Sequence, residues 1–136
     1  MDDARTGIIV DIAKRFIALL QQLEPKWKKG YLRFRLDPAQ YGSNASYENE
    51  AKVLLIDTMR NRQFFGIFNE KGVELMKDLG KPQGVFLLVV DSTFKYNYHF
   101  EYEDLDRWKI SKLEGATGVL VGIPGSFDQL ESSARH

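Results

Sequence analysis

Apolar residues recur every three or four positions at the start of the chain, which is the spacing of one face of an α-helix. This pattern predicts a helix from about Thr6 to Leu23 whose apolar face packs on a sheet. Pro25 disfavours helical geometry at the residue before it, so we expect the helix to end there. The apolar positions are Ile8, Ile9, Ile12, Ala13, Phe16, Leu19, Leu20 and Leu23.

After this helix, short segments of alternating or mainly apolar residues are typical of β-strands. Residues 40–49 are polar, so we predict a loop there, with a turn at Gly42-Ser43-Asn44. The continuous apolar run at 85–90 is typical of a central strand that is covered on both faces. Strands are predicted at residues 31–36, 51–57, 63–67, 85–90 and 95–102.

Start and stop signals place a second helix between the third and fourth of these strands. Asn69 is a suitable N-cap for a short helix that runs to about Leu79, and Gly80 and Pro82 follow where such a helix would end. The turn at residues 91–94 then joins the last two predicted strands into a hairpin.

The remaining residues carry weaker signals. Residues 104–113 predict a short helix. The glycine-rich residues 115–136 predict a flexible tail, with a short apolar run at 119–121 as an edge strand. A chain of 136 residues without a linker fits a single domain, so we assign residues 1–136 to one domain.

The order of these elements predicts the fold class. Strands follow one another in runs and do not alternate regularly with helices, which favours an antiparallel sheet. We therefore predict an α+β fold with an N-terminal helix, a mainly antiparallel sheet of about five strands, and helices packed on one side of it.

Composition and charge narrow the classes of function. The 19 basic and 19 acidic residues give a net charge of zero, which argues against a dedicated nucleic-acid-binding protein. The chain has no cysteine, so disulfides, thiol catalysis and cysteine-based zinc sites are excluded. The acidic start and the lack of an apolar run of about 20 residues predict a cytoplasmic protein without a membrane span.

Catalytic and metal-binding patterns are weak. The sequence has two histidines, and His99 lies in a predicted strand beside Asn97 and Glu101, where a solvated role is more typical than general-base catalysis. No nucleophile elbow, phosphate-binding glycine motif or calcium-loop spacing occurs. We predict no catalytic residues, no metal site and no cofactor, and keep an enzyme acting through His99 as a minor alternative.

Two segments have locally unbalanced charge. The first is basic with interleaved Trp27 and Tyr31, and it fits a nucleic-acid groove, a solvated strand face, or a surface paired with acidic residues or a protein partner. The second, from Lys95 to Asp106, carries one lysine and four acidic residues, which fits a polar sheet face or a docking surface for a basic protein. The basic residues of the first segment are Lys26, Lys28, Lys29, Arg33 and Arg35.

The predicted hairpin resembles that of a known family. Asp91-Ser92-Thr93, then Lys95, the alternation from Tyr96 to Phe100, and Tyr102-Glu103-Asp104-Leu105 resemble the signature hairpin of the YezG-like immunity proteins, the antitoxins of bacterial polymorphic toxin systems. The segment Pro25-x-Trp27-x-Lys29-x-Tyr31-Leu32 is similar to the family's first strand and the residues before it. The resemblance covers about residues 8–106. It departs from the family at Phe94, where glycine is usual, at Gly30, where a β-branched residue is usual, and in the neutral net charge.

The resemblance implies a non-enzymatic inhibitor that binds a cognate toxin domain, often a nuclease. Carboxylates can mimic phosphate in a basic nuclease cleft and steer association. We therefore expect the polar side of the hairpin and the acidic run to meet the toxin, and the aromatic side to be scaffold. Neither nucleic acid nor a membrane is an expected partner; the alternative is a small-ligand or nucleic-acid-binding module that uses the Trp27 segment. The expected toxin-binding residues are His99, Glu101, Glu103, Asp104, Asp106 and Trp108.

Overall fold

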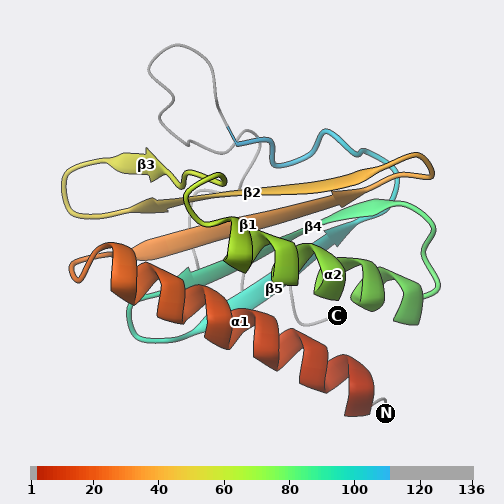
Figure 1. The fold of residues 1–136 in the computed structure, drawn as a ribbon, viewed down its shortest axis with the longest axis horizontal. Helices are drawn as coiled ribbons and strands as arrows, with labels where there is room; N and C mark the ends of the chain where they lie inside the picture. Colours follow the sequence, from red (N-terminus) through yellow and green to blue (C-terminus); the bar gives the residue numbers. More distant parts are fainter. Residues whose placement is uncertain (1–2, 111–136) are drawn as a thin grey trace.

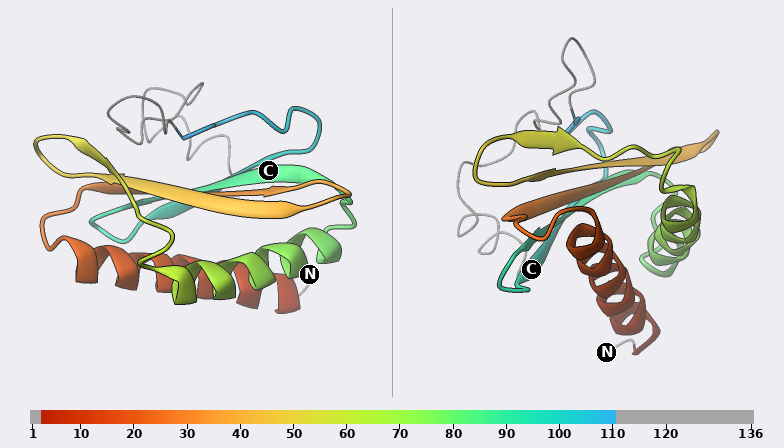
Figure 2. Two further views of the ribbon diagram at one scale, coloured as in Figure 1. Left: turned by 45° about the horizontal axis from the view of Figure 1, so that its top comes forward. Right: turned by 60° about the vertical axis from the view of Figure 1, so that its left-hand side comes forward.

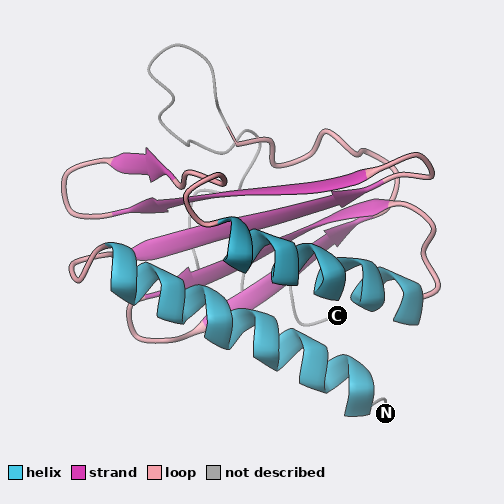
Figure 3. Ribbon diagram, viewed as in Figure 1, coloured by secondary structure: helices cyan, strands magenta, loops and turns pink. Residues whose placement is uncertain are grey.

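Two helices lie side by side on one face of a five-stranded antiparallel sheet (Figures 1 and 3). The computed structural model describes residues 3–110. Within these residues, neither helix is long and apolar enough to cross a membrane. The elements are α1 (Asp3–Leu23), β1 (Lys29–Leu36), β2 (Tyr41–Glu48), β3 (Val53–Leu55), α2 (Arg62–Asp78), β4 (Gly84–Asp91) and β5 (Tyr96–Glu101).

The sheet is built around β1. The strand order is β3-β2-β1-β4-β5, and every neighbouring pair is antiparallel. Leu32 of β1 lies opposite Ala45 of β2 on one side and Leu88 of β4 on the other. α2 carries the chain from one edge of the sheet, at β3, to β4 beyond β1 (Figure 1).

The main core fills the space between the helices and the sheet. Alternation along β1 turns Leu32 and Phe34 toward the helices, where they are fully buried. Phe34 packs edge-on against Phe68 of α2, with ring centroids 5.8 Å apart. Gly72 allows this close approach, because a Cβ there would lie 2.7 Å from the Phe34 ring. Gly30 is required in the same way, because a Cβ would meet Leu20 and Phe16 of α1.

The predicted fold class is confirmed, with the N-terminal helix, an antiparallel five-stranded sheet and helices on one side of it. The predicted helix at 6–23 and the strands at 31–36, 85–90 and 95–102 correspond to α1, β1, β4 and β5.

Two sequence predictions between β1 and β4 were wrong. Residues 40–49 do not form a loop, because Tyr41–Glu48 is a strand that pairs with β1 along its whole length. Residues 63–67 are not a strand but the first turns of α2, so Asn69 does not cap that helix. Phe65, Phe68 and Leu75 are buried together on one side of α2, which is the spacing of a helix face.

The end of the described chain also differs from the prediction. Residues 104–110 do not form a helix; they are turns and extended backbone that lie across the sheet. The rest of the predicted helix, at 111–113, and the predicted tail at 115–136 lie outside the described residues.

Candidate protein-binding site

After β5 the chain crosses the sheet face opposite the helices. We call residues 103–110 the strap; in Figure 2 (left) the helices lie below the sheet and the strap above it. The strap covers a second apolar cluster, because alternation along β4 turns part of its side chains away from the helices. The cluster consists of Val85, Leu87, Val89, Trp108 and Ile110.

The side chain of Glu101 holds the turn from β5 into the strap. One carboxylate oxygen accepts hydrogen bonds from the backbone N–H of Glu103 at 3.0 Å and of Asp104 at 3.1 Å. The other oxygen accepts a hydrogen bond from Arg107 Nη1 at 2.8 Å. The Arg107 hydrogen bond, followed by the two backbone amides, lowers the pKa of Glu101 below its ordinary value. Glu101 is therefore an ionised structural residue of the turn.

Arg33 fixes the middle of the strap from beneath. Its guanidinium donates hydrogen bonds to the carbonyl oxygen of Leu105 at 2.7 Å and to that of Arg107 at 3.0 Å. The residue is only 7% exposed. Burial lowers the pKa of Arg33 and the charge of Arg35 lowers it further, whereas the acidic residues of the strap raise it. A buried cation thus holds two backbone carbonyls of the strap on the sheet.

Trp108 anchors the far part of the strap. Its side chain is 1% exposed, and its backbone is left-handed, with φ at +59°. Its ring packs edge-on against half-buried His99, with centroids 5.3 Å apart, and the Arg107 guanidinium lies 4.8 Å above it. Trp108 therefore holds the strap on the sheet and offers no surface to a partner.

The exposed residues among the expected toxin-binding set are three carboxylates of the strap, Glu103, Asp104 and Asp106. Asp104 accepts a hydrogen bond from the backbone N–H of Asp106 at 3.1 Å, so part of this acidic surface is locally ordered. Lys109 lies 3.5 Å from Asp106, but both side chains are well exposed, so this ion pair is weak. The structure therefore brings three exposed carboxylates together on a fixed segment.

The basic segment around Trp27 does not form a single surface. Trp27 is 4% exposed and belongs to the main core, so its ring is not available for base stacking. Arg33 is buried beneath the strap, and Arg35 is paired with Asp37 at 2.6 Å. Lys28 pairs loosely with Glu50 at 3.4 Å. The residues that looked contiguous in the sequence are thus divided between the core, the strap and the solvent.

The aromatic side of β5 packs toward the helices. Tyr96, Tyr98 and Phe100 all contact the main core. The Tyr98 hydroxyl donates a hydrogen bond to the carbonyl oxygen of Ile9 in α1 at 2.8 Å, and burial raises the pKa of this hydroxyl. This side of the strand is scaffold.

The β4–β5 turn has an unusual tip. Phe94 has φ at +71°, in the left-handed region that favours glycine, and its side chain is 54% exposed. Asp91 Oδ1 accepts hydrogen bonds from the backbone N–H of Thr93 at 2.8 Å and of Lys95 at 3.2 Å, which fixes the turn. The glycine usual in the resembling family would fit this conformation without strain.

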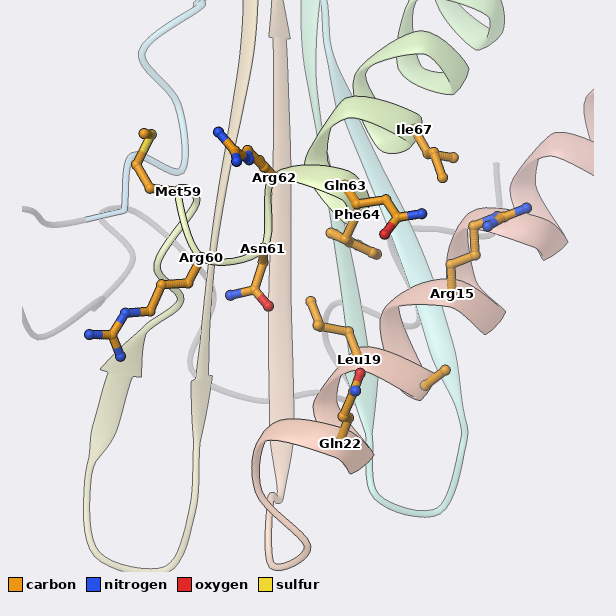
Figure 4. Close-up of a pocket in the computed structure, with 11 residues that line it drawn as sticks. Arg15, Leu19, Gln22, Met59, Arg60, Asn61, Arg62, Gln63, Phe64 and Ile67 are labelled. Atoms are coloured by element: carbon orange, nitrogen blue, oxygen red, sulfur yellow. The ribbon is translucent and has the colours of Figure 1, made fainter.

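Sequence reasoning missed a groove of about 680 Å³ on the helix side of the molecule (Figure 4). It lies between the second half of α1, the loop before α2 and the first turns of α2. The sequence offered one signal, the unbroken polar stretch Arg60-Asn61-Arg62-Gln63 after Met59, whose last residue was assigned to the predicted strand at 63–67. The lining residues are Arg15, Ala18, Leu19, Gln22, Met59, Arg60, Asn61, Arg62, Gln63, Phe64 and Ile67.

The described residues contain no group of three or more His, Asp or Glu side chains placed to hold a metal ion. Comparison of the chain with models of known protein families gives no match, and comparison with curated proteins gives none either.

Proposed function

We propose that this chain is a cytoplasmic immunity protein that neutralises a cognate bacterial toxin by direct binding, without chemistry of its own. The hairpin and Trp27 segments that resemble the YezG-like family motivate this function. The toxin we expect is a nuclease, and the binding surface is the strap.

The observation that carries the proposal is the fixed display of Glu103, Asp104 and Asp106. Glu101 holds the turn at the start of the strap, and Arg33 holds its middle. A surface that is ordered before binding loses less conformational entropy when the complex forms. The strap is therefore suited to recognising a partner whose surface is already folded.

The charge of the strap indicates the chemistry of that partner. Three exposed carboxylates on one short segment complement a basic surface, and nuclease clefts are basic because they hold phosphate. The chain as a whole has a net charge of zero, so any steering comes from local surfaces. A basic toxin cleft would meet the strap as it meets the phosphates of its substrate.

The alternative, a nucleic-acid or small-ligand site at Trp27, has less support from the geometry. Binding of single-stranded nucleic acid depends on exposed aromatic rings beside a cationic groove. Trp27 is in the core and Arg33 is bound to strap carbonyls, so neither is available in this structure.

The test is co-expression of the chain with the toxin domain encoded beside its gene. We expect the chain to restore growth of cells that make the toxin, and the two proteins to elute together in size-exclusion chromatography. A toxin domain from an unrelated system serves as the control and should remain lethal. Failure to bind and failure to protect would together contradict the proposed function.

A further inference from the structure

The groove between the helices, which we call the arginine groove, combines an apolar floor with a cationic rim. In Figure 4, Leu19 and Gln22 of α1 face the start of α2. Phe64 of α2 lies between these two side chains and the α2 ribbon. Arg15 lies on α1, Arg60 on the loop before α2 and Arg62 at the start of α2, and the side chains of Arg60 and Arg62 point outward from the floor (Figure 4).

The floor of the groove is apolar, although polar side chains make up about half of the whole lining. Leu19, Phe64 and Ile67 line it, and Met59 at its edge is 72% exposed, the most exposed of the large hydrophobic side chains within residues 3–110. Flexible methionine side chains adapt well to partner side chains of different shape. The floor therefore offers a contact for an aliphatic side chain.

The rim has positive charge that the groove does not neutralise. Its lining includes Arg15, Arg60 and Arg62 but no aspartate or glutamate. Arg15 pairs with Asp11 outside the lining, but Asp11 also pairs with Lys71 at 3.0 Å, so that carboxylate is shared between two cations.

The positive charges of Arg60 and Arg62 are neutralised even less by nearby carboxylates. Arg60 lies 3.7 Å from Asp57, and its side chain is 87% exposed, so this pair contributes little. Arg62 is exposed and takes part in no ion pair among residues 3–110. An anionic partner would therefore meet at least two available guanidinium groups.

We propose that the arginine groove is a docking site for an acidic peptide segment that carries an aliphatic anchor residue. Guanidinium groups bind carboxylates through paired N–H donors. The floor favours a peptide over a nucleic acid, because the ring of Phe64 is half-buried against Phe16, Phe65 and Phe68 and only part of it is open to a base. The occupant is thus a protein segment with acidic residues around a leucine or similar side chain.

This site is separate from the one proposed for the toxin. The groove lies on the helix side, and the strap lies on the opposite face of the sheet (Figure 2). The inference goes beyond the proposed function and does not depend on it, because a protein bound to the strap leaves the groove open.

The experiment measures fluorescence anisotropy with three labelled twelve-residue probes. The first is a peptide of Glu and Asp with two Leu residues; the second replaces the acids with Gln and Asn; the third replaces both leucines with Gly. We expect the first probe to bind the full-length chain, and each of the other two to bind about tenfold more weakly or worse, which corresponds to about 1.4 kcal/mol per tenfold.

Matched variants locate the binding. The double variant with Arg60→Glu and Arg62→Glu should bind the first probe about tenfold more weakly or worse. Lys14→Glu with Lys77→Glu makes the same change of charge on exposed residues of the two helices outside the groove, and should have little effect. In NMR spectra of the ¹⁵N-labelled chain, the probe should shift the amide signals of groove residues and not those of the strap.

The inference would be overturned by absence of binding of the first probe, by equal loss of binding in both double variants, or by amide shifts outside the groove. Tighter binding of a twelve-nucleotide single-stranded RNA than of the acidic peptide would also overturn it, in favour of a nucleic-acid site. A circular dichroism melt of each variant confirms that it is folded before binding is compared.

Discussion

Nη2 of Arg33 lies 2.7 Å from the carbonyl oxygen of Leu105, which is 72 residues further along the chain. This contact joins the central strand to the strap and lies under the three carboxylates that we assign to toxin binding. It explains why an arginine occupies a buried position on β1: its charge is compensated by strap carbonyls and by nearby acidic groups.

Replacing this arginine should loosen the strap. Arg33→Met keeps much of the apolar stem but leaves two carbonyl oxygens without their donor. We expect the free energy of unfolding to fall by about 1–3 kcal/mol, the cost of leaving buried polar groups unpaired. Urea denaturation measures this change. Arg35→Met, which loses only a half-exposed pair with Asp37, should cost less than about 1 kcal/mol. Equal losses of stability in the two variants would contradict the role of Arg33 in holding the strap.

Phe94 provides a substitution that should stabilise the chain. Phe94→Gly removes a side chain from a left-handed position, where an L-residue costs roughly 1–2 kcal/mol. The greater freedom of glycine in the unfolded state offsets part of this gain, so we expect a net rise of about 0.5–1 kcal/mol in the free energy of unfolding. Thermal and urea denaturation are the measurements. Phe94→Ala keeps the Cβ and should give no such rise; a gain as large as that of glycine would show that the ring, not the backbone, is responsible.

Two glycines of α2 should respond to alanine in opposite directions. At Gly66 a Cβ meets nothing within 4 Å, so Gly66→Ala should stabilise the helix by up to about 1 kcal/mol. At Gly72 the added Cβ would lie 2.7 Å from the ring of Phe34, so Gly72→Ala should destabilise by about 1–3 kcal/mol. Parallel urea denaturation of the two variants tests this; the same sign for both would contradict the close packing of α2 on β1.

Glu101 should make the stability depend on acid pH. Its pKa in the folded state is lowered from its ordinary value of 4.5, chiefly by the hydrogen bond from Arg107. A lowered folded-state pKa means that the stabilisation is fully present above about pH 4.5 and is lost as the pH falls through the folded-state pKa.

The measurement compares Glu101→Gln with the original chain from neutral to acid pH. The neutral variant should be less stable at neutral pH, and the difference in unfolding free energy should shrink as the pH falls below about 4.5. A difference that stays constant with pH would mean that the turn does not depend on the charge of Glu101.

Much of the fold could be predicted from the sequence because its long elements have regular patterns. α1 and β1 show the periods of a helix and a strand, and β4 is a continuous apolar run. β2 was missed because Gly42, Ser43 and Asn44 are typical turn residues. Their strand conformation is imposed by pairing with β1, and tertiary context of this kind overrides local preference.

The predicted number of strands, about five, agrees with the structure because two errors cancel. The missed strand β2 is balanced by the false strand at 63–67, where Gly66 and adjacent phenylalanines concealed the spacing of α2. The predicted order of elements up to β5 was therefore right although two of its segments were assigned wrongly, whereas the short helix predicted after β5 is absent from residues 104–110.

The candidate site was predictable only in part. The exposed positions of Glu103, Asp104 and Asp106 agree with an acidic surface segment. The burial of Trp108 could not be read from the sequence, because it depends on which face of β4 the helices leave uncovered. The arginine groove likewise depends on how α1 and α2 lie beside each other.

The most direct test of the central claim is the dissociation constant for the cognate toxin domain, measured by isothermal titration calorimetry. The strap variant Glu103→Lys, Asp104→Lys and Asp106→Lys is compared with Glu70→Lys combined with Glu74→Lys, which reverses exposed charges on α2. We expect the strap variant to bind about 100-fold more weakly or worse, because it sets like charges against a basic cleft, and the α2 variant to bind as the original chain does. Unchanged affinity in the strap variant would contradict the claim that these carboxylates form the toxin-binding surface.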